Sequence, residues 1–405
     1  MTTVDDQRTT PQHGLGAHSH GAGAGRTNGH GGSSLHRFAS FDVTAHDMPH
    51  GREEAWRFTP MARLRGLHVD TALDSHDHEV TVDADPQVRV EFGAADHPCR
   101  GSSGYVPIDR VSARAWSAAD QVVSVTLPRE VVAARPTVVS LRGQSAEKPA
   151  AGHVVVTAED LSSGVVVLEY EGSATFADNV EVVVGEGAEL TLVTLQEWAD
   201  DAVHLSHHHV KVGRDAILKH VVVTFGGDLV RTATSLDYAG PGGDAQLLGL
   251  YFVDAGQHIE NRLFVDHNTP NARSNVAYKG ALQGKNAHAV WVGDVLIRPE
   301  AEGITTYELN RNLVLTDGAR ADSVPNLEIE TGEIVGAGHA SATGRFDDEQ
   351  LFYLQARGIP ADQARRLVVR GFFTSLINQI GVPALTDHLL AAVERELALH
   401  EAGAA

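Results

Sequence analysis

A repeat of about 28 residues in the middle of the sequence restricts the fold more than any other feature. Short β-branched runs end in tight turns, and a small residue then restarts the apolar pattern. The alanines after four such turns, spaced 28, 29 and 27 residues apart, are Ala188, Ala216, Ala245 and Ala272. Two further turns of this kind, at uneven spacing, end at Ala287 and Ala319. A period of this length indicates a solenoid and is too short for a four-stranded propeller blade.

The runs between these turns are rich in valine and are punctuated by Gly, Asp or Asn, which is typical of strands. No amphipathic helix separates them, which argues against a doubly wound α/β fold. Small turn residues let adjacent coils of a parallel β-helix approach closely. We therefore expect a mainly β protein with a parallel β-helix core over residues 104–344. The pattern alone leaves an irregular β-sandwich as the alternative.

The segments on either side of the expected β-helix differ from it in composition and residue pattern. Residues 1–34 hold eight glycines and the histidines His13, His18, His20 and His30. Such a segment buries too little apolar surface to order itself, and we expect a disordered tail, with metal binding as the alternative. Residues 35–103 are expected to form a mixed, partly helical part. Residues 345–405 should form three helices, the first capped by Asp347, the second starting at Ala361 and the third running from Asp387 to about His400.

Composition narrows the classes of partner and compartment. The formal charge of the 405 residues is 32 − 53 = −21, which argues against nucleic acid and anionic membrane. The sequence has no apolar run of the ~20 residues that cross a bilayer and no secretory leader, so we expect a cytoplasmic protein. Cys99 is the single cysteine, so the chain has no internal disulfide and cannot supply four thiolates to an iron–sulfur cluster.

The sequence contains only incomplete versions of known enzymatic motifs. The segment 280–286 resembles a phosphate loop, but it is one residue short and lacks the Ser or Thr that binds magnesium. We expect no nucleotide binding and no ATPase activity. Cys99 has no base marked in the sequence, so an inert thiol is the expected reading. A carbohydrate-active β-helix enzyme would need paired carboxylates, and the acidic residues that invite this alternative are Asp254, Glu260 and Asp266.

Three groups of histidines are candidate metal ligands. His76 and His78 flank Asp77 in a polar stretch that also reads as a loop. His207, His208 and His209 form a run close to His204. In a strand, His207 and His209 would share one face and His208 the other. His339 follows the last β run, among small residues that leave its imidazole accessible; a structural, hydrogen-bonded histidine is the alternative reading.

The stretch from about 305 to 373 resembles the SufB/SufD family of iron–sulfur cluster assembly proteins. The residues that carry the resemblance are Asn312 to Ala319, Pro325 to Ile329, Gly338 to Gly344, Asp348-Glu349, Phe352 to Leu354, Arg357 to Ile359, Ala364-Arg365 and Gly371-Phe372. Weaker similarity extends back to about residue 110, and Trp56-Arg57-Phe58-Thr59 resembles the N-terminal signature of the family.

The resemblance implies a right-handed parallel β-helix between N-terminal and C-terminal helical parts. It also implies a non-enzymatic scaffold that pairs with SufB through the β-helices and docks the SufC ATPase on the C-terminal helices. A cysteine desulfurase would supply sulfur indirectly. Partner-binding residues carried over from the family pattern are Arg357, Gly358, Ile359 and Phe372.

Two departures favour the SufD branch over a SufB-like paralogue. Asn310, Arg311 and Asn312 occupy positions near which SufB carries a cysteine, and the junction motif at His339 differs from that of SufB. The resemblance makes His339 a ligand of iron or of a transient cluster shared with SufB. Whether a flavin binds the complex stays open.

Overall fold

The computed structural model describes residues 37–75, 78–346 and 348–403. The predicted tail over residues 1–34, with its four histidines, lies outside these residues. The strands are β1 (His78–Asp83), β2 (Arg89–Ala94), β3 (Gln121–Leu127), β4 (Thr137–Ala158), β5 (Ser163–Val184), β6 (Glu189–Trp198), β7 (Val203–Val212), β8 (Ile217–Gly226), β9 (Leu229–Tyr238), β10 (Asp244–Val253), β11 (His258–His267), β12 (Arg273–Leu282), β13 (His288–Ile297), β14 (Ile304–Val314), β15 (Arg320–Ile329) and β16 (Ile334–Arg345). The helices are α1 (Arg110–Ala118), α2 (Asp348–Ala356), α3 (Ala361–Ile380) and α4 (Pro383–Gly403), with short 3₁₀ turns at Val43–Ala45 and Met61–Arg63.

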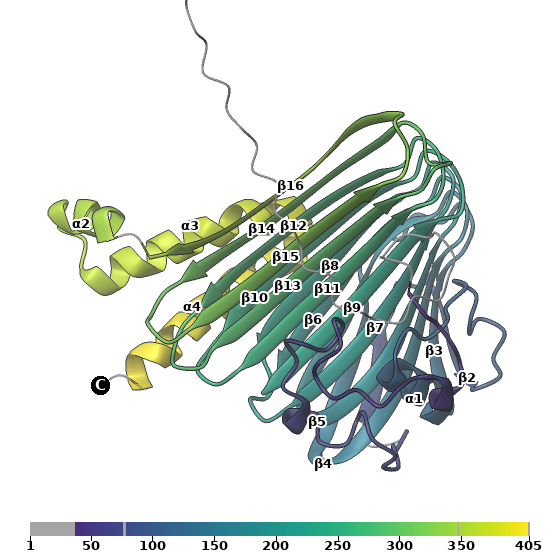
Figure 1. Ribbon diagram of the computed structural model, residues 1–405, viewed down its shortest axis with the longest axis horizontal. Coiled ribbons are helices and arrows are strands. Elements are labelled where there is room, and N and C mark those ends of the chain that lie inside the picture. The colour runs from purple at the N-terminus through teal and green to yellow at the C-terminus, as the bar shows by residue number, and fades with distance from the viewer. Residues whose placement is uncertain (1–36, 76–77, 347, 404–405) are drawn as a thin grey trace, which may run out of the picture. The chain divides into compact units, whose positions relative to one another are not determined.

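The strands form a parallel β-solenoid of about eight turns. Odd-numbered strands from β7 to β15 make one wall and even-numbered strands from β6 to β16 make the other. The long strand β5 joins the walls, because its first half pairs with β6 and its second half with β7. Figure 1 shows the two walls rising in parallel from β4 and β5 to β15 and β16. The prediction of a mainly β protein with a parallel β-helix core is confirmed.

The stacking register corrects one position of the predicted repeat. Glu189, Ile217, Asp244 and Arg273 are successive partners, so the residues before them also stack: Ala188, Ala216, Gly243 and Ala272. Gly243, not Ala245, therefore occupies the third alanine position. A Cβ added at Gly243 would lie 2.8 Å from the Tyr238 ring and 3.0 Å from Val212, so this turn has no room for the methyl group.

The turns at Ala287 and Ala319 belong to the opposite edge of the solenoid. His288 pairs with Arg320, which places these two alanines above each other at the start of odd-numbered strands. The four other turns precede even-numbered strands. The spacing in the sequence is uneven because the turns form two series, one on each edge of the solenoid.

Apolar side chains fill the space between the two walls. Tyrosine and glycine alternate across two of the coils. Gly249 pairs with Tyr278, and Tyr251 pairs with Gly280. A Cβ at Gly280 would lie 1.8 Å from the Tyr251 ring, and one at Gly249 would lie 2.0 Å from the Tyr278 ring. Each ring therefore occupies the volume that a side chain of the next coil would need, which permits two large rings in a narrow interior.

The C-terminal helices cover the outer surface of the even-numbered wall (Figure 1). Leu250 and Phe252 of β10 form one apolar cluster with Phe373 and Leu376 of α3 and with Leu389 of α4. Lys279 of β12 donates to the carbonyl oxygen of Phe372 at 2.7 Å and to Ser375 Oγ at 2.6 Å. No helix in the described ranges is long and apolar enough to cross a membrane.

The structure confirms the predicted start of α3 and corrects the predicted start of α4. The predicted start of the second helix at Ala361 is confirmed, and Gly381 ends it in the left-handed conformation, with φ +69°. The third helix begins at Pro383 rather than at Asp387. Proline has no backbone N–H, and the first helical position needs none, so Pro383 opens α4 as well as ending the connection from α3. The predicted cap Asp347 lies outside the described residues.

The N-terminal part packs on the outer surface of the odd-numbered wall. Trp56 is buried beneath the guanidinium of Arg231, which lies 4.1 Å from its ring centroid. Thr59 Oγ1 donates to Glu260 Oε2 of β11 at 2.7 Å.

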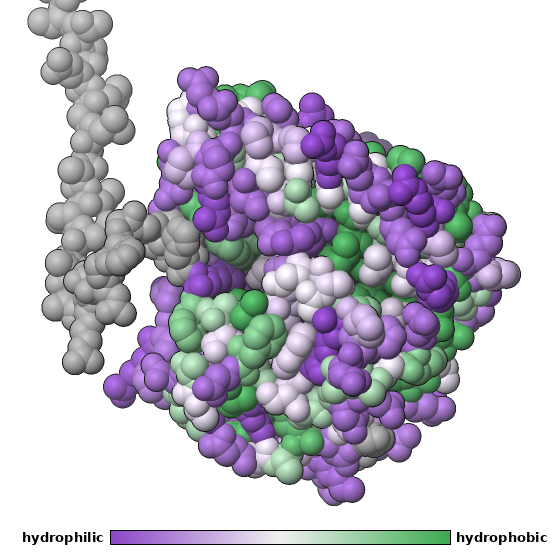
Figure 2. Space-filling model, turned by 90° about the vertical axis from the view of Figure 1, so that its right-hand side faces the viewer, coloured by the Kyte–Doolittle hydropathy of each residue, from purple (hydrophilic) through white to green (hydrophobic). Residues whose placement is uncertain are grey.

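The face shown in Figure 2 mixes polar and apolar residues without a single continuous apolar patch. The 103/104 boundary drawn from the sequence falls between β2 and α1.

We expect Gly280→Ala to lower the free energy of unfolding by about 1–3 kcal/mol, because the added methyl group overlaps the buried Tyr251 ring. Gly336→Ala on β16 is the matched control, since a Cβ there meets no atom within 4 Å. Urea denaturation followed by tyrosine and tryptophan fluorescence measures both changes. Equal stability of the two variants would contradict the interlocked packing of tyrosine and glycine.

Candidate functional site

The solenoid ends at two strands that are paired on one side only in the described part of the chain. β15 pairs with β13 and β16 pairs with β14, and these two strands stand at the ends of the sheet order. Their outward edges carry backbone N–H and C=O groups that are free to pair with another chain. Residues of β15 and β16 are half-buried or exposed, whereas most residues of the preceding strands are buried. We call this surface the open end of the solenoid.

His339 lies at the open end, on β16. Its partner in the parallel register is Glu308 of β14. Side chains at paired positions of parallel strands point to the same face. Glu308 is buried between the walls, so His339 belongs to the same inward-facing row, and it is exposed because no further coil covers it. This fits the accessible imidazole predicted from the small residues around His339.

Glu308 is the residue of this site that sequence reasoning missed. Its side chain is 1% exposed, and neither carboxylate oxygen has a hydrogen-bond partner in the structure. The carboxyl group lies over Gly293 of β13, where an added Cβ would come within 2.6 Å of Oε1. Burial, and then the nearby charge of Asp294, raise the pKa of Glu308 from 4.5 to about 8. The sequence did not mark Glu308, and the alternation of buried and less buried positions along β14 in the structure places it inside.

The other polar residues in this row of β14 are all hydrogen-bonded. Asn312 Nδ2 donates to Asn310 Oδ1 at 2.8 Å and to Ser323 Oγ of β15 at 3.1 Å. Tyr251 OH donates to Asn312 Oδ1 at 2.5 Å. Ser323 Oγ donates to Asn310 Oδ1 at 2.6 Å, which ties the two walls together at their last coil. Asn310 and Asn312 therefore form one hydrogen-bonded group with Tyr251 and Ser323, in the same row of β14 as Glu308.

The histidine run at 207–209 has the face assignment predicted from its sequence. His207 Nδ1 lies 3.1 Å from Tyr105 OH and His209 Nδ1 lies 3.0 Å from Ser103 Oγ, both on the outer side. His208 points inward, with Nδ1 2.9 Å from His220 Nε2. Burial lowers the pKa of His208 to about 4, so it stays neutral at physiological pH.

These histidines and the other candidates do not converge on a metal site of three or more ligands. Across the described ranges, no group of three His, Cys, Asp or Glu side chains is placed to hold a metal ion. His204 Nε2 instead lies 3.0 Å from Asp178 Oδ1 inside the solenoid. His78 and Glu79 lie on β1, and His76 and Asp77 fall outside the described residues.

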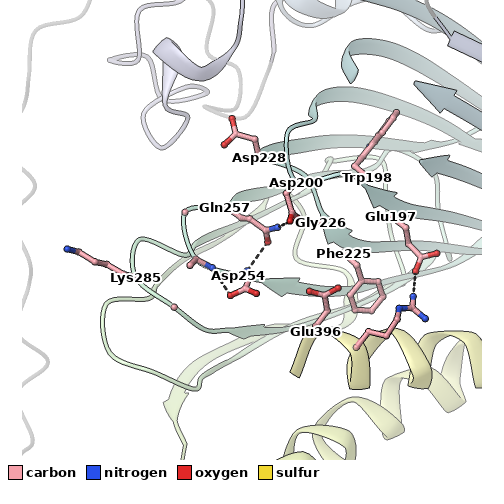
Figure 3. Close-up of a pocket in the computed structure, with 14 residues that line it drawn as sticks. Glu197, Trp198, Asp200, Phe225, Gly226, Asp228, Asp254, Gln257, Lys285 and Glu396 are labelled. Atoms are coloured by element: carbon pink, nitrogen blue, oxygen red, sulfur yellow. Dashed lines mark hydrogen bonds and ion pairs between the residues drawn. The ribbon is translucent and has the colours of Figure 1, made fainter. Parts of the chain in front are cut away.

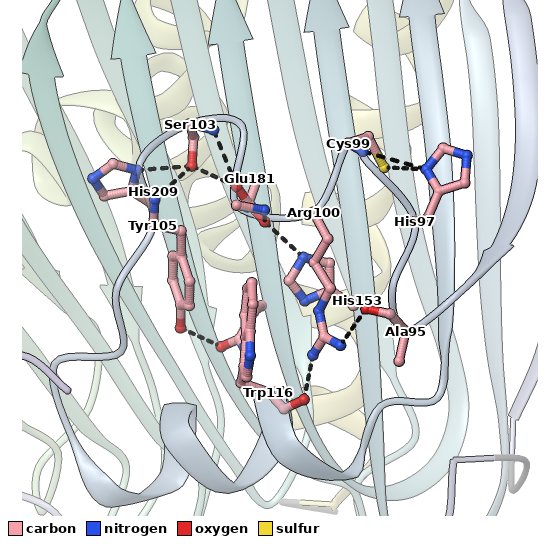
Figure 4. Close-up of polar contacts among 12 residues, drawn as sticks. Ala95, His97, Cys99, Arg100, Ser103, Tyr105, Trp116, His153, Glu181 and His209 are labelled. Atoms are coloured by element: carbon pink, nitrogen blue, oxygen red, sulfur yellow. Dashed lines mark hydrogen bonds and ion pairs between the residues drawn. The ribbon is translucent and has the colours of Figure 1, made fainter. Parts of the chain in front are cut away.

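Cys99 lies in a polar cluster that attaches residues 95–105 to the solenoid (Figure 4). His97 Nδ1 is 2.9 Å from Cys99 Sγ, so a base stands beside the thiol, although the sequence did not mark one. Burial nevertheless raises the pKa of Cys99, which disfavours the reactive thiolate. Glu181 accepts from Gly101 N at 2.6 Å and from Ser103 Oγ at 2.7 Å. These contacts give the cluster a structural role.

An acidic cleft of about 710 Å³ lies between α4 and the turns that lead into the odd-numbered strands (Figure 3). Glu197, Asp200, Asp254 and Glu396 line it. Burial raises the pKa of Glu396 to about 7, and the charges of Asp254 and Asp200 add to the shift. Glu197 is paired with Arg395 at 2.8 Å, so part of the acidic charge is already neutralised.

Two of the acidic residues considered for a glycosidase, Glu260 and Asp266, do not form a reactive pair. Glu260 and Asp266 stand six positions apart on β11, which separates them by about 20 Å at ~3.3 Å per residue. Glu260 is buried against Arg231 and Arg262, and Asp266 is paired with Arg298. Paired catalytic carboxylates lie about 5–9.5 Å apart. The resemblance to a phosphate loop also fails in the structure, because strand β13 and not a helix follows residues 280–286.

The predicted partner-binding residues fall into two environments. Arg357 and Gly358 are exposed in the connection from α2 to α3, and the Arg357 guanidinium lies 4.5 Å from the ring centroid of Tyr353. Ile359 is half-buried. Phe372 is half-buried against the solenoid, with Lys279 Nζ 5.0 Å from its ring centroid. α2 itself exposes 72% of Phe352.

We expect the stability of the metal-free protein to fall as pH rises between about 5 and 8 because of Glu308. In this range the folded chain holds a proton that the unfolded chain releases, so the free energy of unfolding decreases by up to about 1.4 kcal/mol per pH unit. Glu308→Gln should reduce this slope, and Asp317→Asn, which removes an exposed carboxylate from the turn between β14 and β15, should not. Urea denaturation with a chelator at several pH values measures the slopes. Parallel slopes for the Glu308→Gln variant and the native chain would contradict the buried, unpaired carboxyl group.

Comparison with known proteins agrees with this architecture. A family model described as SUF system FeS cluster assembly, SufBD core domain, matches residues 141–372. A SufBD family protein of Mycobacterium bovis is 56% identical over 370 residues, which cover 90% of this chain and 93% of that protein. A relative in Mycobacterium leprae is 53% identical over 371 residues, covering 90% and 94%. The iron–sulfur cluster assembly protein SufD of Bacillus subtilis is 26% identical over 279 residues, covering 67% and 63%.

The family match includes most of β4, all of β5 to β16 and α2, and the first part of α3, and therefore contains the open end with Glu308 and His339. The chain belongs to the SufBD family of iron–sulfur cluster assembly proteins.

Proposed function

We propose that this chain is a SufD-type scaffold subunit without catalytic activity of its own. It pairs with a SufB-type chain through the open end of the solenoid and docks a SufC-type ATPase through its C-terminal helices. His339 supplies a ligand to iron or to a nascent cluster at the pairing surface. The observation that carries the proposal is the open end itself, where both walls stop at unpaired strand edges beside an exposed histidine.

Pairing through the open end follows from the hydrogen-bonding needs of a sheet edge. β15 and β16 present two rows of backbone groups, and a second solenoid can continue both walls by adding a strand to each. Val335 is 76% exposed on β16 and Ile329 is 41% exposed at the end of β15, so apolar side chains accompany the free edges. A partner of the same architecture would cover both features at once.

The assignment to the SufD branch rests on the composition of the site. In this chain the positions next to the pairing surface hold Asn310 and Asn312, and both amides are committed to hydrogen bonds. The single thiol, Cys99, lies in the N-terminal part on the outer side of the solenoid. The chain therefore brings an imidazole and no thiol to the open end, and the partner must supply any thiolate ligand.

Docking of the ATPase is assigned to α2 and its connection to α3. Phe352 and Tyr353 on α2 are 72% and 56% exposed. α3 and α4 instead bury most of their large apolar residues against the even-numbered wall, although Leu367 of α3 is 51% exposed. The exposed aromatic pair, with Arg357 over the Tyr353 ring, forms a surface suited to a protein partner.

We expect His339→Ala to leave folding and pairing with the SufB-type chain nearly unchanged, because the imidazole is exposed and has small neighbours. Cluster formation on the reconstituted complex should fall at least about tenfold through the loss of a ligand. Ser341→Ala, two residues away in the same row, is the control. Melting temperature, complex yield and cluster absorbance are measured on one preparation. A full cluster yield in a stable His339→Ala complex would exclude the ligand role, and lost pairing would indicate a structural histidine.

We expect the double substitution Phe352→Ser and Tyr353→Ser to weaken capture of the ATPase at least about tenfold, since exposed aromatic anchors carry much of the binding energy at interfaces. Phe92→Ser is the matched control, because Phe92 is an equally exposed aromatic residue on β2. Pull-down of the ATPase by the complex measures the effect. Unchanged capture by the double variant would move the docking surface away from α2.

A further inference from the structure

Glu308 stands apart from the other polar residues that face the interior from β14. Thr306 Oγ1 lies 2.6 Å from Ser274 Oγ, and the amides of Asn310 and Asn312 are hydrogen-bonded. Glu308 alone in this row has no partner on either oxygen, although it is 1% exposed. A buried carboxyl group without hydrogen bonds is unfavourable, so its presence calls for a ligand or a function.

The electrostatic surroundings of Glu308 favour a cation. The charge that acts on it most strongly is the carboxylate of Asp294, which is itself held by Arg37 at 2.6 Å and by Asn326 Nδ2 at 2.7 Å. Arg37 is thus committed to Asp294. Asp294 still adds a nearby negative charge at Glu308, of which the ion pair with Arg37 offsets a part.

The geometry places a second ligand next to this carboxylate. Glu308 and His339 are register partners on adjacent parallel strands, about 4.8 Å apart at the backbone. Both side chains belong to the inward-facing row, one beneath the last coil and the other at its rim. To meet the imidazole, the Glu308 carboxylate must turn about its three side-chain torsions, away from the Gly293 position that it lies over.

We propose that Glu308 and His339 together form a divalent-cation site that takes Fe²⁺ at the open end of the solenoid. The inference rests on the proposed function, because it assigns a second protein ligand at the surface where His339 is proposed to act. Imidazole nitrogen with carboxylate oxygen is a ligand set that suits iron. Water completes the coordination in the isolated chain, and groups of the pairing partner can replace that water.

The role of Glu308 in this site is to anchor the ion from inside the solenoid. An ion held by His339 alone would sit on an exposed, mobile side chain. The carboxylate beneath it extends from a strand that is paired on both sides, by β12 and β16, and draws the ion to one position. The buried location also limits the number of waters that compete with the carboxylate for the ion.

The test is metal binding by the full-length chain under anaerobic conditions. Fe²⁺ is measured by equilibrium dialysis, and Co²⁺ serves as a probe whose visible absorption reports nitrogen and oxygen ligands. The native chain should bind one ion at this site. Glu308→Gln and His339→Ala should each weaken binding at least about tenfold. The double variant should lose no more binding free energy than the two single variants lose together. Asp317→Asn, which removes an exposed carboxylate from the turn between β14 and β15, should bind as the native chain does.

Several outcomes would overturn the proposal. It fails if the native chain binds no ion, or if Glu308→Gln binds Fe²⁺ and Co²⁺ with native affinity. A loss of the helical and sheet signals of Glu308→Gln in circular dichroism would assign the carboxyl group to folding instead. The proposed function is tested separately by pairing with the SufB-type chain, which Glu308→Gln should retain. Native pairing with undiminished metal binding in Glu308→Gln would refute the site and leave the scaffold role standing.

Discussion

Parallel, in-register pairing between successive coils is the constraint on which the rest of this structure depends. Each residue stacks on its counterpart one coil away, so each position along a coil becomes a row of side chains with a common direction. A row must be uniformly compatible with the interior, with solvent or with a covering segment. Tyr251 and Tyr278 meet this condition only because glycine stands at the paired position in the adjacent coil. The same rule determines where polar residues can be placed. Asn310 and Asn312 enter the interior in a row where Tyr251 and Ser323 satisfy their amides, and Glu308 enters it without such partners.

A solenoid built in this way cannot close on itself, and its ends decide what it can do. At the first coils, the long strands β4 and β5 and the antiparallel strands β1 and β2 cover the sheet. At the last coil no described segment pairs with the outer edges of β15 and β16. α3 and α4 do not serve this purpose, because they lie on the outer surface of the even-numbered wall, in one apolar cluster with Leu250 and Phe252. Unpaired edges are a liability in a free protein. Their retention beside an exposed histidine is consistent with a surface kept for a second chain, and this links the architecture to the assembly role of the family.

The sequence allowed the fold class to be predicted because the repeat, the β-branched runs and the turn residues all indicate the same arrangement. The assignment of Gly243 could not be predicted, because a coil one residue shorter is indistinguishable from a shifted turn until pairing fixes the register. The start of α4 at Pro383 was missed for a related reason, since proline signals both the end of one helix and the first residue of the next. At the site, small neighbours indicated that His339 is accessible. Glu308 was overlooked because an acidic residue in a strand usually faces solvent. Glu308 is placed inside only by the structure of β14, where alternate residues are buried: Thr306, Glu308, Asn310 and Asn312.

The covering role of the C-terminal helices also determines how their function can be separated from the fold. Removing residues after Gly344 would expose the apolar outer surface of β6, β8 and β10, which α3 and α4 bury, and would release the bonds from Lys279 and Lys219 to helix carbonyls. A truncated chain that fails to capture the ATPase would therefore leave docking and destabilisation confounded. α2 offers a cleaner distinction, because Phe352 and Tyr353 are exposed and do not belong to the apolar cluster over the even-numbered wall. The two parts of the C-terminal region thus differ in their contacts. α3 and α4 pack on the solenoid and stabilise it, and α2 presents apolar side chains that the described part of the chain leaves exposed.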